Sequence, residues 1–429
     1  MKYQTFDQKS YKIHTIKTDR FKTSRIEVFF RFKADKEKLP IRSFLSGVLG
    51  DSSKDYNTSR KLSIQIENLY KCFYSCQLAK VGGTAAIIFA VDFINPEFIK
   101  EKDYINNVVK FLFDMILRPN TNNNEFDLTS FNNIKNDILL DIESISENPG
   151  KMAINNALNA MDKDSMSSYL VLGSKEDIEK VTPEALYNEY IKVMNESVVD
   201  IFAIGNLNME NITSLIKENY HNNRINSEDF SYSIENKLKK KVKKDFMESS
   251  FMQSQLVMLY NTYDLTKDEK ELVFPMFNYI FGNGGLTSKL YQYLREKNGL
   301  CYRVSSMNFR YDNLLCEAVS LKKENIEKAI KLSSKALKEM QQGDFTDDDI
   351  KDAINNLKLS LELGKNSEMG ILNNYELKVF NGNYSFDEKL EKIEKITKED
   401  IIKVANKVKL NTIYSLNEGN HEENNNWKN

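Results

Sequence analysis

The chain has 429 residues, a length that suggests roughly two to four domains rather than a single core. Its 60 Lys and Arg residues nearly balance its 62 Asp and Glu residues, so no global field would attract nucleic acid or an anionic membrane. The longest basic run, residues 237–244, lies in a polar stretch, which favours a solvated linker or an edge strand over a binding patch.

The N-terminal segment alternates charged and apolar positions, which excludes a secretory signal or a membrane anchor. No later stretch approaches the roughly 20 apolar residues of a spanning helix, so we expect a cytoplasmic protein. The cysteines are too few for a disulfide framework and fit a reducing compartment. We expect buried, inert thiols at Cys72 and Cys76, which precede strand-like sequence; the other two cysteines are Cys301 and Cys316.

The first half of the chain predicts alternating strands and helices. Residues 26–32 alternate apolar and charged side chains, as a strand with one covered face does. A capped helix follows at 57–70, and a strand at 85–93. Asn95 and Pro96 then predict the start of a helix that Arg118 and Pro119 end.

Another long helix is predicted from the apolar spacing between Phe131 and Ile145, and Pro149 with Gly150 ends it. The helices are long, and the strands are not continuous hydrophobic runs. We therefore predict an α+β fold in which a largely antiparallel sheet packs with helices.

The chain repeats one pattern about half its length apart. Residues 180–206 predict a helix, an apolar strand and a Gly-Asn end, and residues 395–419 repeat that order. Thr182 and Thr397 begin the two helices as N-caps with an acidic first turn. Such a pattern can also recur by chance in an α+β protein.

The repeat predicts two homologous halves, residues 1–225 and 245–420, joined by a linker at 226–244. The C-terminal dozen residues are polar and low in complexity, which is typical of a frayed end.

Common catalytic motifs are missing from the sequence. A catalytic zinc site needs three ligands, yet the isolated histidines favour structural or solvent-facing roles: His14, His221 and His421. The glycine cluster 282–285 lacks the lysine of a phosphate-binding loop. No serine nucleophile elbow or dinucleotide fingerprint is present.

The segment 282–306 remains, and its spacing predicts a helix, a stop at Asn298 and Gly299, and a strand over 300–309. Arg295 would lie in the last helical turn and Tyr302 early in the strand. On spacing alone, the arginine complements the helix dipole and the tyrosine packs on the sheet. The predicted helical stripe is Leu286, Leu290 and Leu294.

Residues 289–306, with the sequence Arg-Glu-Lys-Asn-Gly-Leu-Cys-Tyr at their centre, resemble the Arg/Tyr signature of insulinase-type (pitrilysin) zinc peptidases. Residues 172–182 and 199–207 are similar to two further stretches of that family. The resemblance implies two homologous α+β halves. It is strongest to the inactive member of bacterial two-gene pairs, whose two chains are expected to close around a peptide.

The resemblance also shows where catalytic zinc would bind. Arg42, Leu45 and Ser46 stand where the family has the first histidine, the glutamate and the second histidine of His-x-x-Glu-His. The third ligand should fall at 134–136, with three carboxylates following nearby: Asp137, Asp141 and Glu143. One carboxylate without two histidines would not hold catalytic zinc, so we expect no catalytic residue, metal ligand or cofactor in this chain.

Arg295 and Tyr302 match the family's substrate-binding pair, which implies that the arginine holds substrate carbonyls and the tyrosine hydroxyl faces the scissile carbonyl. Gly284 and Gly285 resemble a glycine-rich loop that contacts substrate, although they also fit a plain turn. The resemblance implies a noncatalytic subunit that processes peptides with a zinc-bearing partner of the same family.

Two other functions stay open at this point. The chain could be a peptide-binding or structural scaffold without proteolysis. An autonomous hydrolase would need a nucleophile and a base that the sequence does not reveal. Whether the assembly is a heterodimer or a homodimer, and which peptide it takes, does not follow from the sequence.

Overall fold

The structure is a computed structural model that describes residues 1–222, 224–226, 230–236 and 241–419. Its contacts divide the chain into two units, Met1–Glu143 with Leu170–Tyr232, and Ser144–Tyr169 with Ser233–Asn429. The predicted halves, 1–225 and 245–420, differ from these units because Ser144–Tyr169 packs with the second one. Of the predicted linker 226–244, residues 227–229 and 237–240 lie outside the described residues, as does the predicted frayed end from 420 on.

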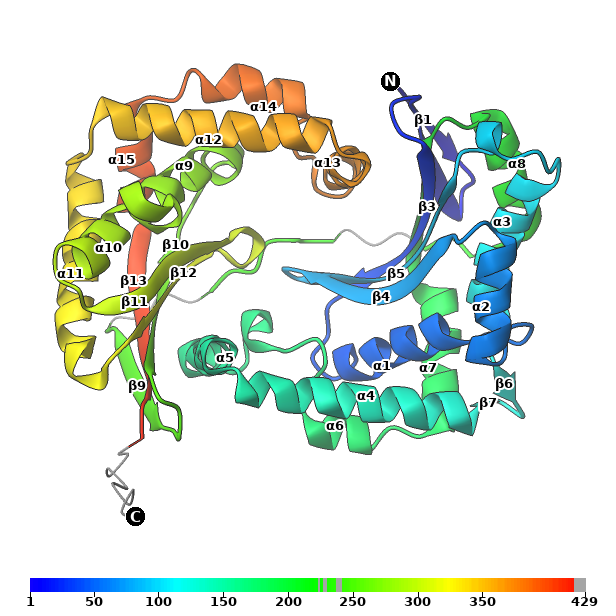
Figure 1. Cartoon of the computed structure of the whole chain (residues 1–429), viewed down its shortest axis with the longest axis horizontal. Helices are drawn as coiled ribbons and strands as arrows, with labels where there is room; N and C mark the ends of the chain where they lie inside the picture. Colours follow the sequence, from blue (N-terminus) through cyan, green and yellow to red (C-terminus); the bar gives the residue numbers. More distant parts are fainter. Residues whose placement is uncertain (223, 227–229, 237–240, 420–429) are drawn as a thin grey trace, which may run out of the picture. The chain divides into compact units, whose positions relative to one another are not determined.

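The first unit is built on a six-stranded sheet in the order β1-β2-β8-β3-β5-β4 (Figure 1). Strands β2 and β8 pair in parallel and the other neighbours are antiparallel. The strands are β1 (Lys2–Asp7), β2 (Tyr11–Lys17), β3 (Thr23–Lys33), β4 (Phe73–Val81), β5 (Thr84–Ile94) and β8 (Val198–Gly205). The alternation at 26–32 and the apolar run at 85–93 thus predicted β3 and β5.

Helices accompany this sheet, and a two-stranded ribbon, β6 (Thr121–Asn122) with β7 (Glu125–Phe126), precedes α4. The helices are α1 (Leu39–Asp51), α2 (Ser59–Asn68), α3 (Tyr104–Leu117), α4 (Leu128–Glu147), α6 (Lys175–Glu179), α7 (Pro183–Glu196) and α8 (Met209–Asn219). The predicted cap of the helix after β5 is wrong. Asn95 is buried and bonds to the carbonyl of Phe21 and the hydroxyl of Ser24, so only the short turn η1 (Pro96–Phe98) follows it and α3 begins at Tyr104.

The second unit has a five-stranded sheet in the order β11-β12-β10-β13-β9. Its strands are β9 (Lys243–Glu248), β10 (Ser254–Thr262), β11 (Cys301–Phe309), β12 (Leu314–Leu321) and β13 (Val408–Asn417). Strand β13 pairs in parallel with β9 and antiparallel with β10, as β8 pairs with β2 and β3. Apart from β1, which has no counterpart in the second sheet, the two sheets share strand order and direction. The homology of the two halves stays a prediction.

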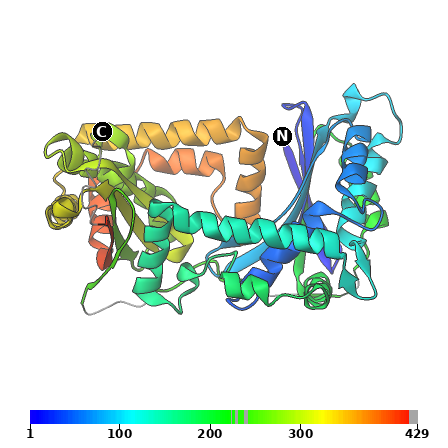
Figure 2. The ribbon, with the colours of Figure 1, turned by 60° about the horizontal axis from the view of Figure 1, so that its bottom comes forward.

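Helices also cover this second sheet. They are α5 (Pro149–Asp162), α9 (Phe274–Asn278), α10 (Lys289–Tyr291), α11 (Ile326–Gln342), α12 (Asp347–Lys365), α13 (Glu368–Asn381), α14 (Phe386–Ile393) and α15 (Lys398–Asn406). Short turns complete the unit: η2 (Met166–Ser168), η3 (Glu269–Val273), η4 (Tyr279–Asn283), η5 (Gly285–Thr287), η6 (Gln292–Glu296), η7 (Arg310–Asp312) and η8 (Lys323–Asn325). Helices α12 and α14 lie side by side in both views (Figures 1 and 2), and Lys358 binds Glu394 between α12 and the end of α14 at 2.5 Å.

The two faces of the second sheet bury separate apolar clusters. One cluster joins the sheet to helices such as α9, α11 and α15. The other joins it to α5, whose Ala153 and Ala157 pack with Val257, Leu259 and Tyr414. Pro149 therefore both ends α4, as predicted, and begins a helix that the sequence analysis did not predict, with Asn148 as its N-cap.

The repeated pattern forms as predicted. Thr182 accepts a hydrogen bond from the backbone of Ala185 and caps α7, and Thr397 accepts one from Asp400 and caps α15. The end of the basic run, Lys243 and Lys244, lies in edge strand β9. The predicted α+β class with largely antiparallel sheets is confirmed.

Candidate functional site

Helix α1 is the helix that the resemblance assigns to zinc. It begins with Leu39 and Pro40, and proline suits the first turn of a helix. Its apolar side chains, including Leu45 with no exposed surface, anchor it to the rest of the first unit. Arg42 and Ser46 are also buried, with 4% and 5% of their surfaces exposed.

Arg42, at the position of the first histidine, forms a buried ion pair. Its Nε donates to Glu189 of α7 at 2.6 Å, and its guanidinium lies 4.0 Å from the centre of the Phe32 ring. A buried guanidinium that is paired and stacked in this way keeps its charge. A fixed positive charge would repel a metal ion from this place.

The remaining ligand positions offer nothing better to zinc. Leu45 has no donor atom, and the Ser46 hydroxyl donates to the carbonyl of Ser43 at 2.8 Å. Ile134 of α4 packs against Gly47, since a Cβ built on that glycine would lie 2.7 Å from Ile134 Cγ2. The region predicted for the third ligand therefore does lie against α1, but it meets α1 through an aliphatic side chain.

Across the described parts of the chain, no group of three or more His, Cys, Asp and Glu side chains could hold a metal ion. Two histidines can be placed. His14 is buried, with Nε2 3.0 Å from Asp200 and Nδ1 2.8 Å from the Tyr3 hydroxyl, so it has the structural role expected. His221 is exposed, and His421 lies outside the described residues.

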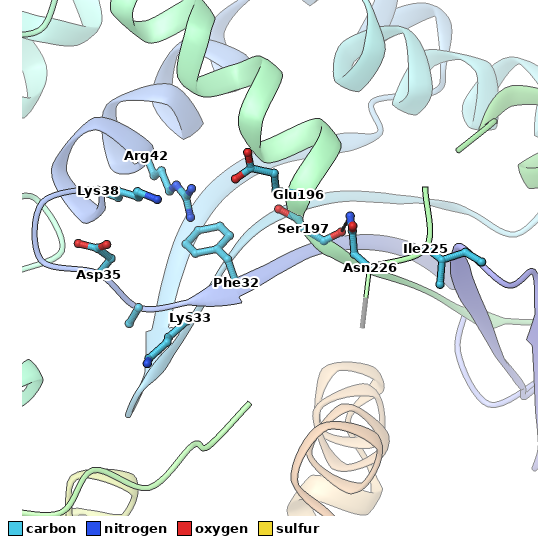
Figure 3. Close-up of a pocket in the computed structure, with 10 residues that line it drawn as sticks. Phe32, Lys33, Asp35, Lys38, Arg42, Glu196, Ser197, Ile225 and Asn226 are labelled. Carbon is cyan, nitrogen blue, oxygen red and sulfur yellow. Dashed lines mark hydrogen bonds between the residues drawn. The ribbon is translucent and has the colours of Figure 1, made fainter. Parts of the chain in front are cut away.

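A hollow of about 570 Å³ opens beside the N-terminus of α1 (Figure 3). Arg42 and Phe32 line it, and so do two lysines and two carboxylates: Lys33, Lys38, Asp35 and Glu196. Cations and carboxylates thus share one wall. This mixture gives the hollow no strong preference for an anionic or a cationic ligand.

Arg295 and Tyr302 lie close together in the second unit. The Arg295 guanidinium is 5.8 Å from the centre of the Tyr302 ring and 5.1 Å from that of Tyr291. Arg295 lies in the π-helical turn η6, a helix variant that is frequent at functional sites. Gly299, with φ +59°, ends the helix as predicted and donates to the Arg295 carbonyl at 2.8 Å.

Tyr302 occupies a bulge at the start of β11. The pairing of β11 with β12 shifts between Cys301 and Arg303, which leaves Tyr302 unopposed. Its side chain is 71% exposed. Bulges next to active sites often redirect a side chain, and here the bulge turns a tyrosine that could pack on the sheet toward solvent.

The glycine turn before this pair has distinct parts. Gly282 lies where η4 approaches β11, since an added Cβ would be 2.6 Å from Ser306 Oγ. Gly284 packs on the carbonyl of Tyr279, whereas Gly285 has φ +61° and open space around its Cα. The predicted stripe is wrong at Leu286, which is 65% exposed because it precedes the first turn of α10.

Known proteins share this architecture. A family model described as the peptidase M16 inactive domain matches residues 180–357. A protein of Bacillus subtilis (strain 168) named probable inactive metalloprotease YmfF is 24% identical over 411 residues, covering 94% of this chain and 95% of the relative. The chain is an M16-like protein. The predicted resemblance to insulinase-type peptidases, the M16 family, and to their inactive members is confirmed.

Solved structures show the same fold as the M16-like chain. A conserved protein from Enterococcus faecalis V583 superposes with a TM-score of 0.92 at 22% identity, covering 97% of this chain and 98% of that one. A peptidase M16 inactive domain from Pseudomonas fluorescens gives 0.76 at 18% identity, with the same coverage. A protease from Helicobacter pylori gives 0.80 at 12% identity, covering 97% and 99%.

The site of this M16-like chain thus separates into two parts. The residues at the zinc positions of α1 do not fit zinc, and they provide neither a base nor a ligand. Arg295 on η6 and Tyr302 on β11 are exposed, and their side chains present hydrogen-bond donors. Among the described helices, none combines the length and apolar character that crossing a membrane requires.

Proposed function

We propose that the chain is a noncatalytic subunit that binds peptides together with a zinc-bearing M16 partner and supplies Arg295 and Tyr302 to the shared site. The observation that carries this proposal is the contrast between the two parts of the site. A buried ion pair joins Glu189 to Arg42, which stands where the resemblance places the first zinc ligand, while Tyr302 is exposed beside Arg295.

The chemistry of the pair suits a peptide substrate. A guanidinium presents a planar fork of donors to carbonyl oxygens, and a tyrosine hydroxyl can donate to an oxygen on which negative charge develops. One such preorganised donor contributes about 3 kcal/mol to catalysis. Strand β11, which carries Tyr302, ends its sheet within the described part of the chain, so an extended peptide could lie along its edge.

The nearest nucleophile speaks against an autonomous hydrolase. Burial raises the pKa of the Cys301 thiol to about 11, and the positive charge of Arg295 offsets this only in part. The thiol therefore stays protonated at neutral pH and is a poor nucleophile. A peptide-binding scaffold without proteolysis remains the alternative, and it would keep the pair for binding alone. The cytoplasmic location stays a prediction.

The test combines the purified chain with a zinc-bearing M16 protein that carries His-x-x-Glu-His, taken from the same organism if its genome encodes one. Alone, the chain should hold less than stoichiometric zinc and hydrolyse no peptide. Mixing should restore hydrolysis, which we expect Arg295→Ala and Tyr302→Phe each to reduce about a hundredfold in kcat. Arg303→Ala removes a neighbouring exposed arginine and serves as the control.

Two results would contradict the composite site. Unchanged kcat in both pair variants would show that the partner works without these donors. Peptide binding by the mixture without hydrolysis would favour the scaffold.

A further inference from the structure

A second cavity opens in the second unit at the far end of β11 from Tyr302. It has a volume of about 430 Å³ and lies among β11, the turn η4 with α9, and α12. We call it the Arg310 cavity. Its polar lining residues are Asn278, Tyr279, Asn283, Ser306, Asn308, Arg310, Asn356 and Ser360.

The lining of the Arg310 cavity favours an anion. Arg310 is its one charged side chain, and no carboxylate lines it. Within the described residues, Arg310 makes no ion pair, and its guanidinium lies 6.0 Å from the centre of the Tyr311 ring. The side chains of Asn283, Asn356 and Ser360 also have no hydrogen-bond partner among the described residues. Their donors are thus available to a ligand.

The surroundings of Arg310 are also positive. Burial lowers the pKa of Lys270 and of Lys389, and the charge of Arg310 lowers both further. Lys389 forms an ion pair with Glu271 at 3.4 Å. A site with unpaired positive charge and neutral donors is suited to a carboxylate.

The cavity further contains an acceptor without a donor. The side-chain oxygen of Asn308 is buried and has no hydrogen-bond partner among the described residues. Leaving such an oxygen unpaired costs about 1–3 kcal/mol. The torsion that turns an Asn amide is broad, so a small rotation would let this oxygen accept an N–H from a ligand.

We propose that the Arg310 cavity binds the carboxylate of a peptide, and that this carboxylate is the C-terminal one. In the last residue of a peptide, the carboxylate and the backbone N–H are attached to the same Cα. The carboxylate could therefore pair with Arg310 while the N–H donates to the Asn308 oxygen. An acidic side chain reaches this arrangement less well, because a flexible stem separates its carboxylate from the backbone. This inference rests on the proposed peptide-binding function and names the end of the peptide that is held.

The position on β11 adds a length requirement. Asn308 lies six residues after Tyr302 on one strand, a separation of about 20 Å at the usual rise of a strand. A peptide that reaches both places in extended form therefore needs about six residues between its C-terminus and the bond at Tyr302. Short peptides could occupy one place but not both.

The test measures binding to the full chain alone, so it does not depend on the zinc partner. Fluorescence polarisation would follow an N-terminally labelled pool of nine-residue peptides of random sequence, as free acids and as C-terminal amides. We expect the amides to bind about tenfold more weakly, the factor that follows from losing one charge-assisted pair. Arg310→Gln should weaken the free acids equally and leave the amides unchanged, while Arg303→Gln on the same strand should change neither.

A third pool of peptides has glutamate as the last residue and an amidated C-terminus. It distinguishes a side-chain carboxylate from the C-terminal one. Binding of this pool as tight as that of the free acids would overturn the choice of the C-terminus. Equal binding of acids and amides, or no binding at millimolar peptide, would overturn the inference as a whole. If carboxylate-dependent binding is found but Arg295 and Tyr302 variants retain full activity with the partner, the composite site fails and the Arg310 cavity stands.

Discussion

Single residues decide what the first unit cannot do. Arg42 and Glu189 lie 147 positions apart in the sequence, and they meet because α1 and α7 pack together. At the position that the resemblance assigns to a zinc ligand, the ion pair leaves a charge that is already satisfied. Sequence reasoning identified Arg42 as a departure from the zinc pattern but could not name Glu189, because nothing in α7 marks one of its glutamates as buried.

Glu317 is a buried carboxyl group of the second unit that has no part in the proposed site. It is fully buried, and it accepts hydrogen bonds from the Tyr260 hydroxyl at 2.7 Å and from the Ser333 hydroxyl. Burial raises the pKa of Glu317 from 4.5 to about 7, although both hydroxyls act in the opposite direction. The carboxyl group is thus stabilised in its neutral form inside the fold.

We predict that Glu317→Gln makes the chain less sensitive to alkaline pH. Because the folded-state pKa is raised, the contribution of this group to stability is complete below about pH 4.5 and is lost as the pH rises through 7. The difference corresponds to at most about 3 kcal/mol. Thermal unfolding from about pH 5 to pH 8 should show a smaller loss of Tm in the variant, since glutamine cannot ionise.

The natural control is Glu327→Gln, which removes a carboxylate at the exposed start of α11. The Tm of this variant should fall with rising pH as much as that of the unchanged protein. An equal loss of Tm with pH in the Glu317 variant would show that this carboxyl group is not the cause.

At the scale of elements, the sequence predicted strands β3, β5, β8, β11 and β13 and the helices that follow Thr182 and Thr397, because apolar periodicity and N-cap residues are local signals. Thr182 and Thr397 show this, since each caps the helix that its own neighbours form. Asn95 shows the limit. The same residue type that caps helices is used here to hold the start of β3, and that partner lies 71 residues away.

The pair on η6 and β11 was predictable for a similar reason. Arg295 and Tyr302 lie seven positions apart across one helix stop, so a local pattern brings them together. The bulge at Tyr302 was not predictable, because it depends on the register with β12. Arg310 was also missed, since its surroundings come from α9, η4 and α12.

We predict that Gly282→Ala separates η4 from β11. The added methyl group would lie 2.6 Å from both Ser306 Oγ and Leu290 Cδ1, so the helix and the strand must move apart. Overpacking of this kind costs about 1–3 kcal/mol. Chemical denaturation should show a lower free energy of unfolding, and activity with the zinc partner should fall because Leu290, which the methyl group would meet, lies in the helical segment that carries Arg295.

Gly150→Ala is the matched control in α5. A Cβ there meets nothing closer than Asn148 Oδ1 at 3.5 Å, and alanine is favoured over glycine in a helix. It should leave stability unchanged or raise it by up to about 1 kcal/mol. If both variants lose the same stability, the close approach at Gly282 does not explain the effect.

At the scale of the whole molecule, the two units repeat one sheet topology but do not correspond to two continuous halves of the chain. Segment Ser144–Tyr169 lies before the end of the first unit in sequence and belongs to the second. Its helix α5 covers the face of the sheet that α9, α11 and α15 leave open. Periodicity could predict a helix there but not which sheet it covers.

The packing of α5 on the second sheet predicts where the chain can be cut into fragments that fold. A fragment starting at Ser233 lacks α5 and would expose an apolar face that includes Val257, Leu259 and Leu416, so we expect it to aggregate or to melt without a cooperative transition. Joining residues 144–169 to its N-terminus through a flexible linker should restore a cooperative melt by circular dichroism. Asn156 would then again donate to the Tyr414 hydroxyl, at 3.0 Å in the structure.

The control is a linked segment with Ala153→Asp and Ala157→Asp. It keeps the length of the linked segment, but its charged side chains cannot enter the apolar cluster, so it should not restore the cooperative melt. Cooperative folding of the shorter fragment by itself would show that α5 is not part of the second unit's core.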